Sequence, residues 1–487
     1  MITETQVAII GAGFGGLGAG IKLREAGIDD FVILERADGL GGTWRANTYP
    51  GCACDVPSHL YSYSFAMNPD WTRDYATQPE ILAYLERTAH ERGVAEHIVY
   101  DAEVLGARWD AETSRWHLDT EQGPLTAQSI VAAMGPLSEA SRPEIPGLDS
   151  FEGTMFHSFD WDHAHSLEGE RVAVIGTGAS AVQFIPHVAE AAAHTDVYQR
   201  TPGWIVPRPD KEITPQRQSL LRRRPRLQRG MRYFIYYGAE ALNVGLIMEK
   251  RLLSLLELVA RRKLRKEVPD PAMRAKLRPP YRIGCKRIIF SNDYLPTLSR
   301  PDVELVTDGI AEIDATGIRT VDGRHRPVDT IVLGTGFKLF SSPFWNRITG
   351  AEGETLGDRW AREMPQAYRG TMVAGFPNLF MIIGPNTALG NNSMINIIEG
   401  QLVYVMDALK AMRASGATAI DVQRPIQDRH NEQLQSAMDG TVWLEGGCNS
   451  WYLAPDGTNR TLWPSFSNAF LRQMRGFDLA DFEVSRA

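Results

Sequence analysis

Two stretches of the sequence repeat one pattern: a short apolar strand, a glycine-rich turn, a helix and a second strand. The first, VAIIGAGFGGLGAGIKLREAGIDDFVILER, turns on Gly11, Gly13 and Gly16 and ends in Glu35. In such a turn the first glycine permits the sharp bend, the second lets the backbone approach a pyrophosphate, and the third allows close helix–strand packing. The helix N-terminus offers free N–H groups to phosphate oxygens. Since the terminal carboxylate can bind an adenosine ribose, this unit predicts an FAD site.

The second stretch, RVAVIGTGASAVQFIPHVAEAAAHTDVYQRTP, has Ala181 at the third turn position, a permitted replacement. Its second strand ends in Arg200 in place of an acid. An arginine there accommodates a ribose 2′-phosphate, which a carboxylate would repel, so this unit predicts NADPH. The turn residues predicted to bind the coenzyme are Gly176, Thr177, Gly178 and Ser180.

Two further strand patterns, at 129–138 and 329–337, end in glycines. Each is interpreted as a strand that rejoins a nucleotide-binding domain after an inserted segment. The sequence therefore predicts an α/β fold with two Rossmann-like dinucleotide-binding domains and a helical insertion. The predicted ranges are 1–142 with 340–487 for a discontinuous FAD-binding domain, 151–212 with 283–339 for the NADPH-binding domain, and 213–282 for the helical insertion.

The helical insertion differs in composition from the rest of the chain. It is rich in arginine, poor in glycine and has helical periodicity. A basic, apolar stretch of this kind could lie on a membrane surface. The more common structure for such a composition is a helical subdomain whose charges face water. The sequence leaves both alternatives open.

Composition narrows the class of protein. The 487 residues carry a formal net charge of −8, which argues against nucleic acid as the main partner. The sequence shows no signal-peptide pattern and no apolar run of roughly 18 residues, so no integral membrane segment is expected. Four scattered cysteines are too few for a disulfide framework, which favours a reducing, cytoplasmic location. They are Cys52, Cys54, Cys285 and Cys448.

The segment FEGTMFHSFDWD, 151–162, links the two predicted domains. It has every fixed position of F-x-G-x-x-x-H-x-x-x-W-[P/D], the fingerprint of type I Baeyer–Villiger monooxygenases, which are class B flavoprotein monooxygenases. With the two flanking dinucleotide motifs, the chain resembles this family over essentially its whole length. The resemblance implies that His157 and Trp161 act on interdomain geometry and on the handling of NADPH.

The resemblance also assigns residues around both cofactors. The segment 41–65 is similar to the family's flavin-contacting loop, although WRANTYPG replaces the WYWNRYPG of many members and points to a different subgroup. That loop implies FAD contacts for Gly42, Thr43, Trp44, Asp55 and Tyr61. The segment 284–306 implies that Lys286, together with Arg200 and Thr201, binds the 2′-phosphate and that Arg287 is catalytic. The segment 384–401 implies that Met394 lies near the substrate. The segment 449–460 implies that Trp451 lies on a mobile loop that closes over the nicotinamide.

The implied reaction inserts one oxygen atom of O2 next to a ketone carbonyl through a peroxyflavin and gives an ester or a lactone. Anions develop during such a reaction, and a fixed cation stabilises them. An arginine suits this role because it stays protonated. We therefore predict that Arg287 is catalytic and that Asp55 holds it in place.

Three alternatives differ in chemistry. A flavin-containing monooxygenase would oxygenate sulfur or nitrogen, but the tryptophan–Asp end of the linker and Arg287 weigh against it. Thiol–disulfide reduction requires a redox pair such as C-x-x-C, and Cys52 and Cys54 lie one residue too close together. A non-enzymatic FAD-binding signalling protein would show no ketone-dependent oxidation of NADPH.

Overall fold

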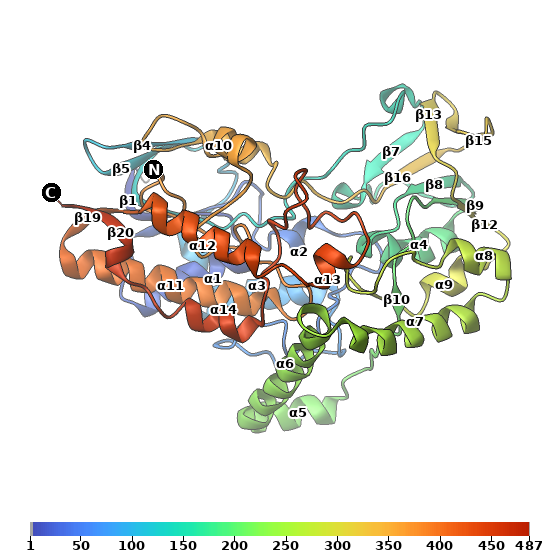
Figure 1. Cartoon of the computed structure of the whole chain (residues 1–487), viewed down its shortest axis with the longest axis horizontal. Coiled ribbons are helices and arrows are strands. Elements are labelled where there is room, and N and C mark those ends of the chain that lie inside the picture. Colours follow the sequence, from blue (N-terminus) through green and yellow to red (C-terminus); the bar gives the residue numbers. More distant parts are fainter. Residues whose placement is uncertain (1–2, 487) are drawn as a thin grey trace.

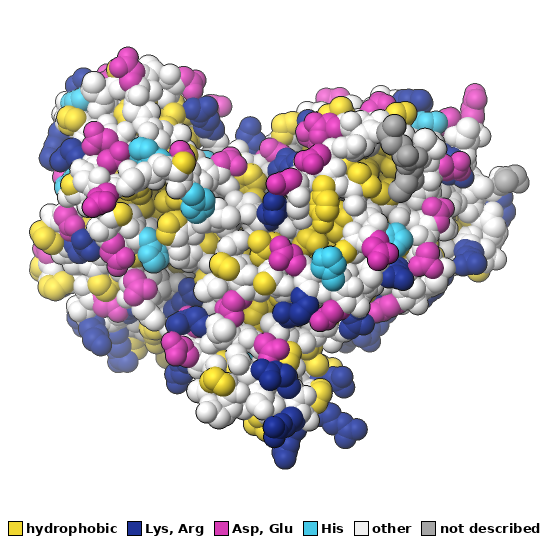
Figure 2. All heavy atoms as spheres, turned by 180° about the vertical axis from the view of Figure 1, so that it is seen from behind, with side chains coloured by type: hydrophobic (Ala, Val, Ile, Leu, Met, Phe, Trp, Pro, Cys, Tyr) yellow, Lys and Arg dark blue, Asp and Glu magenta, His cyan; other side chains and the backbone are white. Residues whose placement is uncertain are grey.

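Two sheets organise the chain, one for each glycine-rich turn (Figure 1). The structure is a computed structural model that describes residues 3–486. The sheets lie side by side, and a notch separates their lobes at the top of Figure 2. The structure confirms the predicted α/β fold with two Rossmann-like units and a helical insertion.

The first sheet has eight strands and is built around β1 (Glu4–Ile10). This strand is almost fully buried and pairs in parallel with β2 (Phe31–Leu34) and β6 (Gly123–Ala132). The helix α1 (Phe14–Glu25) makes the crossover between β1 and β2, as the sequence predicts. The sheet also contains β3 (Ile98–Val99), β4 (Val104–Asp110), β5 (Arg115–Thr120), β17 (Ile348–Thr349) and β18 (Leu379–Met381).

The second sheet is wholly parallel and has the order β12-β9-β8-β16-β7. The helix α4 (Ala179–Ala191) joins its two central strands, β8 and β9. A small antiparallel sheet of β13 (Ile310–Asp314), β14 (Gly317–Thr320) and β15 (His325–Pro327) extends this lobe. The strands are β7 (Thr154–His157), β8 (Arg171–Ile175), β9 (His194–Tyr198), β12 (Val303–Val306) and β16 (Thr330–Leu333).

Helices from distant parts of the chain cover the first sheet. The long helix α11 (Met394–Ser415) packs on α1 and contributes buried residues to the apolar core below the sheet (Figure 1). The remaining elements of this lobe are α2 (Thr43–Ala46), α3 (Gln78–Glu91), α10 (Leu356–Glu363), β19 (Ala417–Val422), α12 (Arg424–Ser436), α13 (Val442–Glu445), α14 (Ser467–Gln473) and β20 (Phe482–Arg486).

Four helices form an arm: α5 (Pro215–Arg223), α6 (Pro225–Ile247), α7 (Leu253–Glu267) and α8 (Pro271–Lys276). In Figure 1, α5 and α6 project below both sheets, whereas α7 runs beneath the second sheet and α8 lies at the side of that lobe. Arg232 fixes α6 to the first lobe: its buried guanidinium donates to the carbonyl oxygens of Leu60 and Ser62, both at 2.8 Å, and to Oδ1 of Asn396 at 3.0 Å. Among residues 3–486, the helices all fall short of the length and apolarity that crossing a membrane requires.

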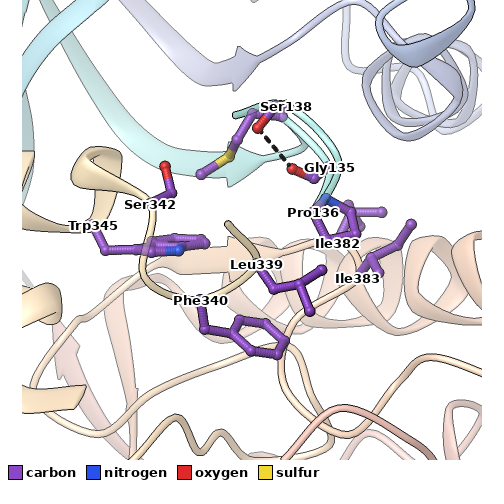
Figure 3. Close-up of a pocket in the computed structure, with 10 residues that line it drawn as sticks. Gly135, Pro136, Ser138, Leu339, Phe340, Ser342, Trp345, Ile382 and Ile383 are labelled. Carbon is purple, nitrogen blue, oxygen red and sulfur yellow. Dashed lines mark hydrogen bonds between the residues drawn. The ribbon is translucent and has the colours of Figure 1, made fainter. Parts of the chain in front are cut away.

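The chain passes between the lobes at two neighbouring places. Residues 138–141 and 336–338 lie antiparallel, where the Ser141 N–H donates to Gly336 O at 2.8 Å and the Lys338 N–H to Glu139 O at 2.9 Å. Figure 3 shows a small, largely apolar pocket beside these crossings. Its lining contains none of the predicted site residues and consists of Met134, Gly135, Pro136, Ser138, Leu339, Phe340, Ser342, Trp345, Ile382 and Ile383.

Candidate active site

The predicted catalytic pair forms across a long distance in sequence. Arg287 lies just before the short strand β11 (Ile289–Phe290), and Asp55 lies in the loop that follows β2 and α2. Nε and Nη2 of Arg287 donate to the same oxygen of Asp55, Oδ2, at 2.9 and 2.7 Å. The two side chains are 30% and 31% exposed, so the pair is held firmly while one edge stays accessible.

The surroundings keep Arg287 charged. The Asp55 carboxylate raises the pKa of the guanidinium well above its usual range, against the opposing effect of burial. Nη1 also donates to the carbonyl of Leu389, at 3.4 Å. Within residues 3–486 these three contacts leave two of the five N–H groups of an arginine for a ligand. The arrangement offers a permanent cation with open donors.

The first glycine turn has the geometry of a phosphate cradle. Gly11 has φ +100°, which other residues rarely adopt, and a Cβ on Gly16 would lie 1.8 Å from Gly11 O. Gly13 is the N-cap of α1 and makes no side-chain hydrogen bond there, so the first N–H groups of the helix are open to an anion. The buried Glu35 carboxylate is fixed beside this turn by the N–H groups of Ala12, at 2.7 Å, and Ala37, at 3.0 Å.

The predicted flavin-contacting loop packs against this turn. A Cβ on Gly42 would lie 3.0 Å from Gly13 Cα, so the two backbones touch at this point. Gly42 is the N-cap of α2, which carries Thr43 and Trp44. The indole Nε1 of Trp44 donates to the Tyr61 hydroxyl at 3.0 Å. The structure therefore gathers these predicted residues around one uncapped helix end, a donor set that fits FAD.

The second glycine turn repeats this geometry at the N-terminus of α4. Gly176 has φ +114°, and a Cβ there would lie 2.3 Å from Gly334 O. Gly178 caps α4 without a side-chain hydrogen bond, and a Cβ on it would meet open space. Thr177 lies in this turn, and Ser180 is the second residue of α4. An uncapped helix end facing open space fits the pyrophosphate of NADPH.

Two cations gather near the end of β9 without a counter-ion. Burial, and then the charge of Arg200, lowers the pKa of Lys286, so the two side chains lie close enough to repel each other. Within the described chain neither side chain forms an ion pair. Thr201 is half-buried beside Arg200. A cationic pair without a carboxylate fits the 2′-phosphate of NADPH.

The two remaining predicted residues are Met394, at the start of a helix, and Trp451, in a loop. Met394 is half-buried and is the first residue of α11, which Ser393 caps. Trp451 is 52% exposed in the loop after α13, and its ring centroid lies 4.3 Å from that of Tyr452. Tyr452 is buried near the catalytic pair: burial raises the pKa of its phenol to about 12, and Arg287 opposes this shift. The loop therefore reaches the site through Tyr452.

Comparisons with known proteins address the identity of this site. A family model described as pyridine nucleotide-disulphide oxidoreductase matches residues 8–233, which include both glycine turns. A Baeyer–Villiger monooxygenase from Streptomyces coelicolor is 46% identical over 488 residues, covering 99% of this chain and 93% of the relative. Another, from Pseudomonas aeruginosa, is 46% identical over 482 residues, covering 99% and 91%.

The chain belongs to the Baeyer–Villiger monooxygenase family.

Solved structures agree with this assignment. An oxidized steroid monooxygenase bound to NADP has a TM-score of 0.87 and 31% identity, and covers 100% of both chains. Cyclohexanone monooxygenase from Rhodococcus sp. Phi1, bound to NADP+, has a TM-score of 0.89 and 27% identity over the same coverage. The comparisons confirm the predicted family, its enzyme class and its cofactors, FAD and NADPH.

As a Baeyer–Villiger monooxygenase, the chain is an oxidoreductase that inserts one oxygen atom of O2 next to a ketone carbonyl.

The two N-terminal cysteines do not form the redox pair of a thiol–disulfide reductase. Cys52 and Cys54 are buried free thiols. Burial raises the pKa of Cys52 to about 11 and that of Cys54 well above its usual range, so neither is a ready nucleophile.

The linker fingerprint contributes to the junction between the lobes. Trp161 packs on Phe184 of α4, with ring centroids 5.4 Å apart, and Phe184 packs on Tyr49 of the flavin loop at 5.8 Å. Gln183, which sequence reasoning missed, receives the Tyr49 hydroxyl at 3.0 Å and donates to Ala53 O at 2.9 Å. In the sequence, Gln183 is one polar residue beside the apolar Phe184 on a predicted helix, so nothing marked it as a contact between the lobes.

The four cysteines form no disulfide framework, but two of them are paired, which the sequence did not indicate. Cys285 and Cys448, 163 residues apart, form a disulfide. Scattered spacing gave no sign of it because only the fold brings the two segments together. The bridge ties the loop of Trp451 to the residue that directly precedes Lys286 and Arg287.

Breaking this bridge should loosen the Trp451 loop, because no helix or strand lies between Cys448 and Phe466. We expect Cys448→Ser to speed proteolytic cleavage near Trp451 severalfold, as followed by mass spectrometry of the fragments. A reductant should speed cleavage of the wild type and leave the variant unchanged. Equal cleavage of wild type and variant would show that the bridge does not restrain the loop.

Proposed function

We propose that the enzyme converts a ketone and O2 into an ester or a lactone at the Arg287–Asp55 pair, with Arg287 as the catalytic cation. The position of this pair carries the proposal. Arg287 directly follows Lys286 of the coenzyme-phosphate site, and Asp55 belongs to the segment 41–65, which also contains Trp44 and Tyr61. One ion pair therefore connects the residues assigned to NADPH with those assigned to FAD.

The chain's own residues then have distinct tasks. Reduced FAD, when bound, supplies the activated oxygen. Arg287 donates its open N–H groups to oxygen atoms that become negatively charged, in a site that needs no reorganisation. Asp55 orients the guanidinium through Oδ2 and keeps it from turning towards water. Met394 at the start of α11 borders the substrate, and Trp451 closes over the nicotinamide.

The cofactors are held by the two glycine turns and their partners. For FAD we assign Gly11, Gly13, Gly16, Glu35, Gly42, Thr43, Trp44, Asp55 and Tyr61. For NADPH we assign Gly176, Thr177, Gly178, Ser180, Arg200, Thr201, Lys286 and Trp451. We also propose a cytoplasmic location, which the free thiols of Cys52 and Cys54 support, although the Cys285–Cys448 bridge does not. The division into 1–142 with 340–487, 151–212 with 283–339, and 213–282 remains our domain proposal, and the separate sheets support it.

A panel of linear, cyclic and aromatic ketones tests this function. Product chromatography should reveal an ester or a lactone from at least one ketone, with NADPH consumed in equal amount. Aryl sulfides and amines belong in the same panel, because oxygenation of sulfur or nitrogen is the alternative activity. A protein that oxygenates the sulfides and amines but no ketone would contradict the proposal.

Coenzyme choice tests the phosphate site. We expect Arg200→Ala to raise KM for NADPH tenfold or more, because one charge-assisted contact contributes about 1.5–3 kcal/mol. KM for NADH should barely change, since NADH lacks the 2′-phosphate. Lys286→Ala should act in the same direction. Steady-state kinetics with both coenzymes give the answer, and equal effects on the two would refute the assignment.

A further inference from the structure

The helix α6 is inverted relative to an ordinary surface helix. Its polar residues Gln228, Glu240 and Asn243 face the protein and are buried, in the same face as Arg232. Large apolar or aromatic side chains are exposed on the other side, where Phe234 and Tyr237 lie about one helical turn apart. The most exposed is Phe234, at 80%. The others on this face are Leu227, Tyr233, Tyr237 and, just beyond the helix end, Met248.

The next helix is inverted only in part. In α7, the charged residues Glu257 and Lys263 are buried together with Leu253 and Ala260, while Leu255 is 68% exposed. Leu220 of α5, Leu252, Leu258 and Val259 are exposed as well. Of the 15 large hydrophobic residues exposed in the described chain, 10 lie between residues 220 and 259. Scattered exposed hydrophobics are normal, but such a concentration in three consecutive helices is not and marks an interaction surface.

The arm is also strongly basic. Residues 213–282 hold 18 of the 51 lysines and arginines but only 5 of the 59 acidic residues, a net formal charge of +13 against −21 for the rest of the chain. Arg223, Arg226 and Arg229 are exposed and, within the described chain, form no ion pair. In Figure 2 the lowest part of the molecule shows basic side chains beside hydrophobic ones.

We propose that the exposed face of α5, α6 and α7 docks on the surface of an anionic lipid bilayer. An amphipathic helix with outward aromatic and aliphatic side chains and flanking arginines matches the headgroup region of a membrane. Anionic headgroups complement the +13 charge of the arm. The helices lie on the bilayer and do not cross it, in agreement with their limited length and apolarity.

Charge also decides against the other occupants of this face. A symmetric dimer through the same face would place two arms of +13 against each other, and their repulsion opposes association. Nucleic acid would satisfy the arginines but leave Phe234, Leu255 and Met248 in contact with a polar backbone. A lipid surface accommodates the charges and the apolar side chains together.

Vesicle flotation with the FAD-loaded protein tests the proposal. We expect the wild type to float with vesicles of 70% phosphatidylcholine and 30% phosphatidylglycerol, and to stay behind with pure phosphatidylcholine. High salt should weaken binding, because screening shortens the range of surface charges. Absence of flotation with the anionic vesicles at low salt would overturn the proposal.

Two sets of variants locate the contact. The triple variant Arg223→Glu, Arg226→Glu and Arg229→Glu should weaken binding by about 100-fold or more, since each basic side chain near an anionic surface contributes a factor of about five. The double variant Phe234→Ser with Leu255→Ser should weaken binding at least tenfold. A matched control, Arg413→Glu with Arg472→Glu and Arg475→Glu, changes the net charge equally at exposed positions outside the arm.

The control variant should float almost as well as the wild type. All variants should keep the bound-flavin absorbance and the ketone-dependent oxidation of NADPH, which shows that they are folded. If the arm variants float as well as the wild type, the contact lies elsewhere and the proposal fails. If the wild type instead sediments as a dimer that Phe234→Ser dissociates, and does not float, the face is an interface between two copies.

Discussion

Replacing Arg287 with alanine is expected to lower ester or lactone formation by about 10²–10³, the usual cost of removing one preorganised electrostatic donor. FAD should still bind, because the glycine turn and Glu35 are unaffected. NADPH should still reduce the flavin, since Lys286 and Arg200 remain. Oxygen consumption should then yield hydrogen peroxide in place of product. Stopped-flow absorbance of the flavin with parallel product and peroxide assays measures each step.

Two further variants separate charge from position. Arg287→Lys keeps the positive charge but loses the forked donors, so it should recover only part of the lost rate. Asp55→Ala leaves the arginine in place without its anchor and should give a milder loss of product than Arg287→Ala. Product formation by Arg287→Ala at a near wild-type rate would mean that the catalytic cation is another residue.

Replacing Gly16 with alanine should abolish FAD binding and destabilise the first lobe. The added Cβ would lie 1.8 Å from Gly11 O, so the turn or the helix must move. Overpacking in cores typically costs 1–3 kcal/mol, and we expect about 3 kcal/mol or more here because the clash is with backbone. Flavin absorbance relative to protein absorbance, together with thermal unfolding, measures the two effects.

Three matched variants show whether the backbone clash causes the loss of FAD binding and of stability. Ala181 occupies the same place in the second turn, and Ala181→Gly should cost only about 1 kcal/mol, as for any helical glycine. Gly13→Ala and Gly178→Ala should cause no clash within the protein. A Cβ on Gly13 would lie 3.6 Å from its nearest neighbour, and a Cβ on Gly178 would have no neighbour within 4 Å. They should fold normally and bind their cofactors less well. A stable, yellow Gly16→Ala protein would show that the turn adjusts freely.

Much of the fold follows from short-range sequence patterns. The strand at Phe31–Leu34 and the two glycine turns were predictable because their residue types answer local backbone demands. The class of site could also be predicted, since each turn is followed by a charge that distinguishes the two cofactors, Glu35 and Arg200. The resemblance to a family added the residues that local patterns do not mark, such as Arg287.

The parts that sequence did not reveal depend on long-range contacts. The Cys285–Cys448 bridge spans 163 residues, and the Gln183 contact with Tyr49 joins two lobes. The inversion of α6 was equally hidden. Its amphipathic period shows that one face is apolar, but only the packing of Arg232 against carbonyl groups shows that the polar face is the one turned inward.

The paired crossings at 138–141 and 336–338 have a consequence for protein engineering. Because the chain leaves and re-enters the first lobe at adjacent points, with Ala140 bridged to Phe337, the whole intervening segment has neighbouring ends. Inserted segments with adjacent ends can be exchanged without stretching the host. The coenzyme-binding module of a related oxygenase could therefore be grafted between these two residues, which makes nucleotide preference a transferable cassette.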